Sequence, residues 1–295
     1  MLTRLLSYLA MAILWLLHFL PLSLLAVIGQ QLGVLFMVFA KRRRKIAVTN
    51  LSWCFPELDP ASLSKLVKAH FRILGRSGLE RSLLWWASEK RLMRLIKVNG
   101  EEKITARLNA GKPVIFFAPH FSGLDAGGLA MAMRFSGVSI YSTQRYELFD
   151  RIIFKSRSRF NDQLLLSRQD GVRATVKAIR NGRPFYYLPD MDFGSHDSIF
   201  VPFFGIQTAT ITGLSRLSRL TGAAILPCIT RILPGNQGYV VDIGDAWDDF
   251  PTDDVVADTR RMNAFIEETI RTMPEQYHWV HRRFKTRPEG EAYPY

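Results

Sequence analysis

The sequence predicts an α/β protein: a sandwich built on a largely parallel central sheet, with membrane-associated helices at the N-terminus. Two observations support this prediction. From residue 112 onward, short apolar segments of strand character alternate with segments of helical length, which is the pattern of a parallel sheet built from βαβ units. Before that point, residues 5–40 carry no formal charge unless His18 is protonated, and only Pro21 interrupts their helical character.

The apolar N-terminal stretch predicts attachment to a membrane. A spanning helix needs about 20 apolar residues, so residues 5–40 permit either one tilted span or two half-length helices that enter and leave one leaflet. The basic run "KRRRK" at 41–45 follows directly and, by the positive-inside rule, stays on the cytoplasmic side. A cleaved signal peptide fits less well, because no small-residue cleavage site follows. We expect a membrane anchor at 1–45 and a single cytoplasmic domain at 46–295.

The remaining elements follow from hydrophobic periodicity. In residues 60–96 apolar side chains recur every three or four residues, which predicts helices with Asp59 or Ser62 as the N-cap. Strands are expected at 112–120, 137–143, 163–167, 184–190, 223–232 and 237–247. Helices are expected at 125–136, 147–161, 170–181, 210–221 and 253–273.

The composition limits the classes of function. The 295 residues carry a formal net charge of +13, which favours a polyanionic partner such as nucleic acid, anionic lipid headgroups or an acidic protein. Cys54 and Cys228 are the two cysteines, and they lie far apart without metal-ligand spacing. A disulfide framework and a zinc cluster are therefore not expected, and we interpret both thiols as structural.

A titratable pair follows the first strand of the sheet, in the segment "PHFSGLD". Asp125 lies five residues after His120, which on one continuous helix would rotate it about 140° away. The two can meet if His120 ends the strand and Asp125 lies in the first turn of the next helix, where the carboxylate could accept the Nδ1 proton and leave Nε2 as a general base. Active sites of open α/β sheets lie at such carboxyl ends. Chance spacing without chemistry is the alternative.

A second polar cluster lies between residues 187 and 205. Its members Asp190, Asp192, His196 and Asp197 have oxygen and nitrogen ligands that could suggest a metal site. No regular ligand spacing appears, and the prolines and glycines around them are typical of turns. We therefore expect a loop whose carboxylates orient basic side chains or cap backbone donors, with no metal.

Basic residues recur through the globular part and at the C-terminus. Some are expected to line solvated helix faces. The run at 281–290, which contains Arg282 and Arg283, interleaves aromatic with basic residues. Such a run suits single-stranded nucleic acid, or lipid phosphates when it lies beside a membrane anchor. The basic residues of the globular part are Arg145, Arg151, Lys155, Arg157, Arg159, Arg168 and Arg173.

Three segments resemble the late lipid A acyltransferases, the lauroyl and myristoyl transferases of Gram-negative bacteria. They are "PHFSGLD", "LPDMDFGSHDSIFVPFFGIQTATITG" and "PEQYHWVHRRFKTRPEG", and the apolar N-terminus extends the resemblance over nearly the whole chain. The resemblance implies a glycerolphosphate-acyltransferase-like fold. It also implies an inner-membrane enzyme without a cofactor, which moves an acyl chain from acyl carrier protein, or coenzyme A, to a hydroxyl of a lipid A precursor.

The resemblance also implies roles for particular residues. His120 and Asp125 match the family's motif of His, four residues, then Asp or Glu, which makes them the catalytic pair: His120 would deprotonate the acceptor hydroxyl, and Asp125 would orient His120. Arg168 and the Pro-Asp-x-Asp residues Asp190 and Asp192 match family positions. The remaining substrate contacts we expect are Arg145, Arg282 and Arg283, although "YSTQRYE" lacks the Tyr-Arg pair that some members have.

Three rival functions stay open from the residues. One is an acyltransferase of the same fold that acts on a lysophospholipid or another glycolipid. Another is a membrane-tethered protein that binds nucleic acid or another polyanion through its basic C-terminal run without catalysis. The third is a metal-dependent hydrolase built on Asp190, Asp192 and His196. With the family resemblance, we expect an acyltransferase and no nucleic-acid partner.

Overall fold

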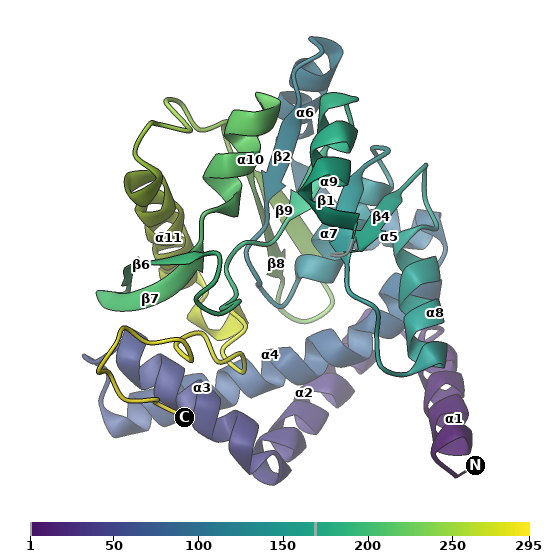
Figure 1. The fold of residues 1–295 in the computed structure, drawn as a ribbon. Coiled ribbons are helices and arrows are strands. Elements are labelled where there is room, and N and C mark those ends of the chain that lie inside the picture. Colours follow the sequence, from purple (N-terminus) through teal and green to yellow (C-terminus); the bar gives the residue numbers. More distant parts are fainter. Residues whose placement is uncertain (1, 168–169) are drawn as a thin grey trace.

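The computed structural model describes residues 2–167 and 170–295, with the side chains of 2–6 left out. Its centre is a seven-stranded sheet in the order β1-β9-β8-β2-β5-β3-β4, where β8 and β9 pair antiparallel and the other neighbours pair parallel (Figure 1). The expected α/β sandwich with a largely parallel sheet is confirmed. The strands are β1 (Ile96–Asn99), β2 (Val114–Phe117), β3 (Val138–Tyr141), β4 (Leu164–Ser167), β5 (Phe185–Tyr187), β8 (Ala224–Ile232) and β9 (Tyr239–Ile243).

Helices cover both faces of this sheet. Side chains of β2 alternate between the two cores: Ile115 and Phe117 pack with α9, α10 and α11, whereas Val114 and Phe116 pack with α4 and α7. The helices are α1 (Leu2–Leu17), α2 (Leu22–Phe39), α3 (Lys41–Cys54), α4 (Pro60–Trp86), α5 (Glu89–Leu95), α6 (Glu101–Asn109), α7 (Leu124–Ala132), α8 (Glu147–Arg157), α9 (Gly171–Arg180), α10 (Gly213–Thr221) and α11 (Val255–Thr272).

The structure adds elements that periodicity did not predict. The expected helical region 60–96 is split, because Ser88 caps a separate α5 and β1 begins at Ile96. The basic run 41–45 forms the first turns of α3 rather than a linker. A separate antiparallel hairpin of β6 (Ser198–Phe203) and β7 (Ile206–Ile211) occupies the stretch before α10, so this helix begins at Gly213.

The N-terminal helices pack on the body of the protein through glycines. α4 lies across the lower part of Figure 1, with α2 and α3 beneath it. Gly29 and Gly33 of α2 face Gly75 of α4 so closely that a Cβ added at Gly33 would lie 2.0 Å from the Phe71 carbonyl oxygen. One face of α2 is thereby fixed against α4, while its opposite face stays open.

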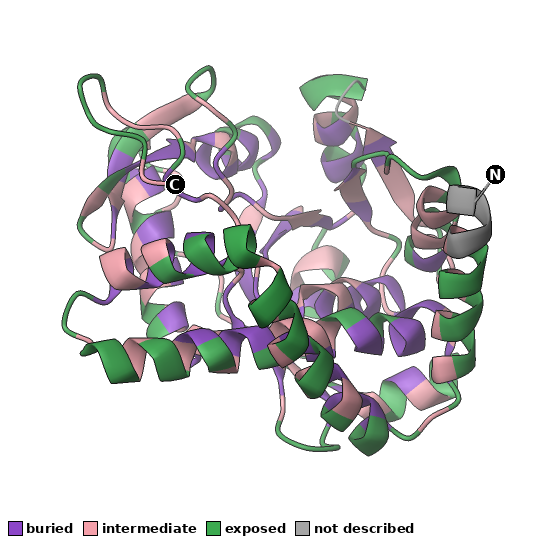
Figure 2. Ribbon diagram, turned by 90° about the horizontal axis from the view of Figure 1, so that it is seen from below, coloured by how far each residue is buried: buried purple, intermediate pink, exposed green. Residues whose placement is uncertain are grey.

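The open faces of α1 and α2 carry large apolar side chains. α2 is long and apolar enough to cross a membrane. Figure 2, seen from the side on which both helices lie, shows exposed segments along them. The many exposed apolar side chains on these two helices form an apolar surface, and a large surface of this kind marks an interaction site. The exposed side chains are Tyr8, Leu9, Ile13, Trp15, Leu16, Phe19, Leu24, Val27, Leu32, Leu35, Phe36, Val38 and Phe39.

Candidate active site

His120 stands three residues beyond the end of β2, at the carboxyl edge of the sheet. Its Nδ1 lies 2.6 Å from Asp190 Oδ1, and its backbone N–H donates to Asp190 Oδ2 at 2.8 Å. Asp190 stands three residues beyond the end of β5, and β5 pairs with β2. Neighbouring parallel strands therefore bring the two residues together, as expected at such an edge.

The Asp190 carboxylate fixes the tautomer of His120. Burial of Asp190 raises its pKa, but His120 and the hydrogen bonds from His120 and the Tyr277 hydroxyl outweigh burial and lower the pKa to about 2. An ionised carboxylate only accepts hydrogen bonds, so the proton of a neutral His120 lies on Nδ1. Nε2 is then the free basic nitrogen, on a side chain that is 21% exposed.

The expected hydrogen bond between His120 and Asp125 is absent, and Asp190 takes its place. Asp125 does lie in the first turn of α7, but its carboxylate faces α4 and α8. It accepts from Arg81 Nε at 2.9 Å and lies 3.5 Å from an Arg157 nitrogen. Burial raises the pKa of Asp125, and the two guanidinium groups outweigh this and lower it. Asp125 thus joins two arginines beside the site instead of orienting the imidazole.

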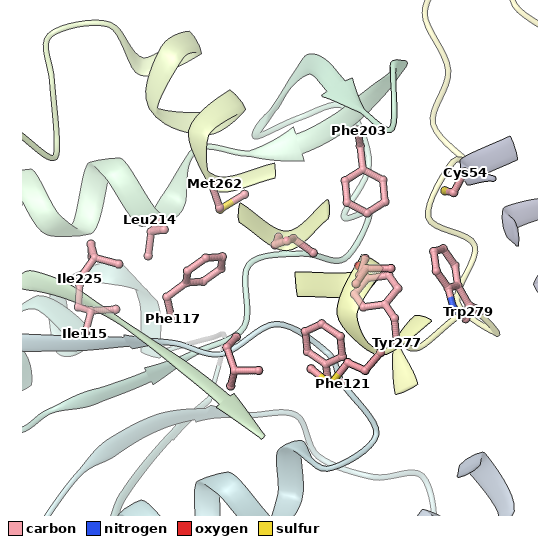
Figure 3. Close-up of a cluster of buried hydrophobic side chains, with 14 of the residues drawn as sticks. Cys54, Ile115, Phe117, Phe121, Phe203, Leu214, Ile225, Met262, Tyr277 and Trp279 are labelled. Carbon is pink, nitrogen blue, oxygen red and sulfur yellow. The ribbon is translucent and has the colours of Figure 1, made fainter. Parts of the chain in front are cut away.

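The C-terminal segment 274–287 holds the His120 loop from the other side. The His278 N–H donates to the His120 carbonyl at 3.0 Å, and the Ser122 N–H donates to the Gln276 carbonyl at 2.7 Å. Phe121 and Tyr277 form an isolated β-bridge, and their rings pack edge to face (Figure 3). Residues 276–278, just before the aromatic and basic run at 281–290, are therefore part of the site.

Two of the expected substrate contacts, Asp192 and Arg283, are buried and hydrogen-bonded to other parts of the protein. Asp192 accepts from the backbone and the hydroxyl of Thr286, both at 2.8 Å, and so fixes the C-terminal segment. Arg283 donates to the Ala209 carbonyl at 2.8 Å and to the Thr210 hydroxyl at 2.9 Å, and it is 2% exposed. Asp192 also lines the cavity beside His120. Substrate contact by Asp190, Asp192 and Arg283 stays a prediction.

The other expected contacts lie elsewhere. Arg145 is exposed and stacks on its neighbour Tyr146, outside the cavity beside His120. Arg282 donates to the Tyr293 hydroxyl at 3.1 Å, also outside that cavity. Arg168 lies outside the residues that the structure describes.

The residues of the hydrolase alternative do not converge. Asp190 binds His120, Asp192 binds Thr286, and His196 is 97% exposed beside Asp197. Across residues 2–167 and 170–295, no group of three or more His, Cys, Asp or Glu side chains could hold a metal ion. Cys54 and Cys228 are buried free thiols.

A cavity of about 1540 Å³ opens at His120. One part extends along α7 and α8 and is mainly apolar, while another lies toward α9 and α10 and includes Arg216. Arg81, Asp125 and Arg157 lie on its wall, and together they carry one net positive charge. The arrangement offers a basic imidazole nitrogen, apolar space and cationic groups for an anionic partner.

Sequence reasoning missed Arg81, Arg157 and Tyr277 as members of the site. For Arg81 and Arg157 no signal separates them from the other basic residues on helix faces. Tyr277 lies in the quoted C-terminal segment, but its place beside Asp190 depends on how that segment folds back. Asp190 was predicted as a substrate contact, but its pairing with His120 was not predicted. That pairing could have been found, because "PFYYLPD" ends at the same sheet edge as His120.

Comparisons with known proteins agree along the whole chain. Residues 1–286 match the family model described as bacterial lipid A biosynthesis acyltransferase. The Escherichia coli lipid A biosynthesis lauroyltransferase is 35% identical over 97% of this chain and 93% of its own length. The E. coli palmitoleoyltransferase of lipid A biosynthesis is 32% identical over the same shares. The E. coli myristoyltransferase of lipid A biosynthesis is 29% identical over 86% of this chain and 79% of its own length.

Among solved structures, the 1-acyl-sn-glycerophosphate acyltransferase of Thermotoga maritima is similar, with a TM-score of 0.39 and 14% identity. The alignment covers 82% of this chain and 95% of that one. The family match spans nearly all of the sequence, including the residues on both sides of the cavity. This chain belongs to the bacterial lipid A biosynthesis acyltransferases.

Proposed function

We propose that this protein transfers a fatty acyl chain from acyl carrier protein to a hydroxyl of a lipid A precursor. The observation that carries the proposal is the pairing of His120 with an ionised, buried Asp190, which leaves Nε2 free at the mouth of a large cavity. Family membership supports the lipid A precursor as acceptor.

The reaction needs one base and one nucleophile. His120 Nε2 takes the proton of the acceptor hydroxyl as its oxygen attacks the thioester carbonyl of the donor. The new ester bond forms as the carbon–sulfur bond breaks, and the imidazolium returns its proton to the departing thiolate. Asp190 stabilises the imidazolium by charge and keeps it oriented. No acyl-enzyme is required, because the acceptor supplies the nucleophile.

Asp125 acts indirectly in this mechanism, by holding Arg81 and Arg157 at the cavity wall. Both arginines are partly exposed, so each keeps N–H groups that can meet a phosphate of the acceptor or donor. The formal charge of +13 suits both proposed partners, since lipid A precursors are polyanionic and acyl carrier proteins are acidic.

The proposed location is the cytoplasmic side of the inner membrane. The glycine contacts fix α2 to α4, and Arg91 donates to the Leu20 carbonyl at 2.5 Å in the turn between α1 and α2. These contacts favour a hairpin that enters one leaflet by its open apolar faces over a helix surrounded by lipid. The exposed basic residues 41–45 then lie near the anionic headgroups. The division into an anchor at 1–45 and a domain at 46–295 stays a prediction.

The direct test is acyl transfer by the purified full chain. Acyl carrier protein loaded with a labelled chain is incubated with a lipid A precursor or a lysophospholipid, with and without a chelator. Label is expected in the lipid A product with wild type, regardless of chelator, and to be lost with His120→Ala. Label in the lysophospholipid alone would contradict the proposed lipid A acceptor. Loss of transfer with chelator would favour a metal-dependent mechanism.

A further inference from the structure

The cavity continues from the catalytic edge as an apolar arm along α7. Asp125, Gly128, Ala132 and Phe135 recur at intervals of three or four residues, so they line one face of the helix and of the turn that follows it. The Phe135 N–H still donates to the Met131 carbonyl at 2.9 Å, so the turn continues the helix. A rise of about 1.5 Å per residue puts Phe135 about 15 Å from Asp125.

The other walls of this arm come from α8 and β5. We call the acyl arm the part of the cavity lined by Gly128, Ala132 and Phe135 together with Phe149 and Ile153 of α8 and Tyr186 of β5. These side chains are apolar apart from the Tyr186 hydroxyl, which donates to the Leu124 carbonyl at 3.0 Å. Among these six residues, no polar side-chain group would lose a hydrogen bond when a hydrocarbon chain fills the arm.

Gly127 and Gly128 of α7 differ in the space that a side chain would have. A Cβ added at Gly127 would lie 2.1 Å from Thr230 Oγ1, so Gly127 is required for helix–sheet packing. A Cβ added at Gly128 would meet only the Tyr186 ring, at 3.4 Å or more, which is ordinary contact. The packing of the protein therefore does not require glycine at position 128, whereas an open arm does.

A neighbouring loop, residues 159–163, fixes the Phe135 end of the arm. Phe135 packs against Phe116 with ring centroids 6.4 Å apart. Gln163 Nε2 donates to the Phe135 carbonyl at 2.7 Å, and Asn161 Nδ2 donates to the Ala132 carbonyl at 2.8 Å. Arg159 anchors the same loop to α4 through the Trp85 carbonyl at 2.7 Å. A narrow apolar arm that starts beside His120 suits one unbranched chain.

We propose that the acyl arm holds the chain of the donor, and that Gly128 and Phe135 set the chain length that the enzyme transfers. This rests on the proposed acyl transfer. The donor fits better than the acceptor because a thioester carbonyl at His120 places its single chain into the arm. A lipid A precursor carries several chains joined to an anionic headgroup, which need a route to the membrane.

The test compares donor preference among variants. Wild type, Gly128→Leu and Phe135→Ala are given acyl carrier proteins loaded with chains of ten to sixteen carbons and one fixed acceptor. Gly128→Leu should shift the ratio of kcat/KM toward shorter chains by at least about tenfold, since a few methylenes are worth that much in an apolar pocket. Phe135→Ala should shift it toward longer chains.

Gly78→Leu is the matched control, because Gly78 lies on α4 outside the cavity and a Cβ there meets nothing within 4 Å. It should keep the wild-type preference, and thermal melting should show that all variants fold. An unchanged donor preference in both arm variants would overturn the proposal. A second series keeps one donor and varies the acceptor chains; if the arm variants change only this acceptor preference, the arm belongs to the acceptor and the proposal fails. If wild type transfers no chain of any length, the proposed function itself has failed.

Discussion

At the scale of single residues, the chemistry depends on which carboxylate meets His120. The sheet order decides this, since β5 lies beside β2 and brings Asp190 to the imidazole, while Asp125 turns toward Arg81 and Arg157. The sequence predicts the place of His120 at the sheet edge, because a buried strand followed by a polar turn is a local signal. The partner depends on strand order, which no local pattern carries.

This division of roles predicts different spectra for two variants. In protein labelled with ¹⁵N-histidine, Asp190→Asn should change the His120 tautomer, because an amide can donate where the carboxylate only accepted. Asp125→Asn should leave the His120 signals at their wild-type positions. A tautomer change in Asp125→Asn alone would return Asp125 to the role first expected from the sequence.

At the scale of elements, the contact of α2 with α4 depends on glycine. A Cβ at Gly75 would lie 2.3 Å from the Gly29 carbonyl oxygen, whereas Gly78 on the same helix has open space. Gly75→Ala should therefore destabilise the protein by about 1–3 kcal/mol through overpacking. Gly78→Ala should be neutral or stabilise by about 0.5–1 kcal/mol. Thermal unfolding in detergent measures both, and equal midpoints would contradict the close packing of α2 on α4.

Two buried histidines of the C-terminal segment, and His70 of α4 that contacts the Glu275 carbonyl, predict a loss of stability in mild acid. Burial lowers the pKa of His70 to about 4, of His278 to about 3 and of His281 to about 4, from an ordinary value of 6.5. As the pH falls below 6.5, the unfolded chain takes up protons that the folded chain refuses, so folding becomes less favourable between pH 6.5 and about 4. Asp190, with a lowered pKa of about 2, contributes its own loss only below about pH 4.

Chemical unfolding at pH 7.0 and 5.5 checks this. The free energy of unfolding should fall at the lower pH. His70→Gln should reduce this fall, because the variant has one fewer histidine that binds a proton only in the unfolded chain. His196→Gln is the control, since His196 is exposed whereas His70 is fully buried. Equal pH dependence in wild type and His70→Gln would show that His70 does not stay neutral in the folded state.

At the scale of elements, hydrophobic periodicity predicted some helices and strands and not others. Long periodic helices such as α11 were predicted to within two residues, and Asp59 does cap α4. β1 and α6 were not predicted, because β1 directly follows the helical pattern of 60–95 and α6 buries only Ile104. Arg283 looked like a phosphate ligand because its partners lie on β7, in a hairpin that the sequence did not reveal.

At the scale of the whole molecule, apolar and basic surfaces lie on the same side. The open faces of α1 and α2 adjoin the exposed cations of α3, while α6 lies at the opposite end in Figure 1. Replacing Arg42, Arg44 and Lys45 by Gln should weaken binding to vesicles that contain anionic lipid on the order of a hundredfold, at about 1 kcal/mol per charge. The loss should shrink at high salt.

A triple variant with the same change of charge is the control for this prediction. Lys97, Arg107 and Lys112 lie on or beside β1 and α6, away from the N-terminal helices. Their replacement by Gln should leave vesicle binding close to wild type. If both triple variants bind equally weakly, net charge rather than the proposed orientation controls attachment.

The most direct measurement is the single-turnover rate of acyl transfer from acyl carrier protein to a lipid A precursor, in wild type, His120→Ala and Asp190→Asn. Loss of the imidazole base, or of the carboxylate that fixes its tautomer, should slow the chemical step by about 10³–10⁴-fold. Both variants should still unfold cooperatively near the wild-type midpoint. A folded His120→Ala or Asp190→Asn protein that transfers the chain at the wild-type rate would contradict general-base catalysis by His120.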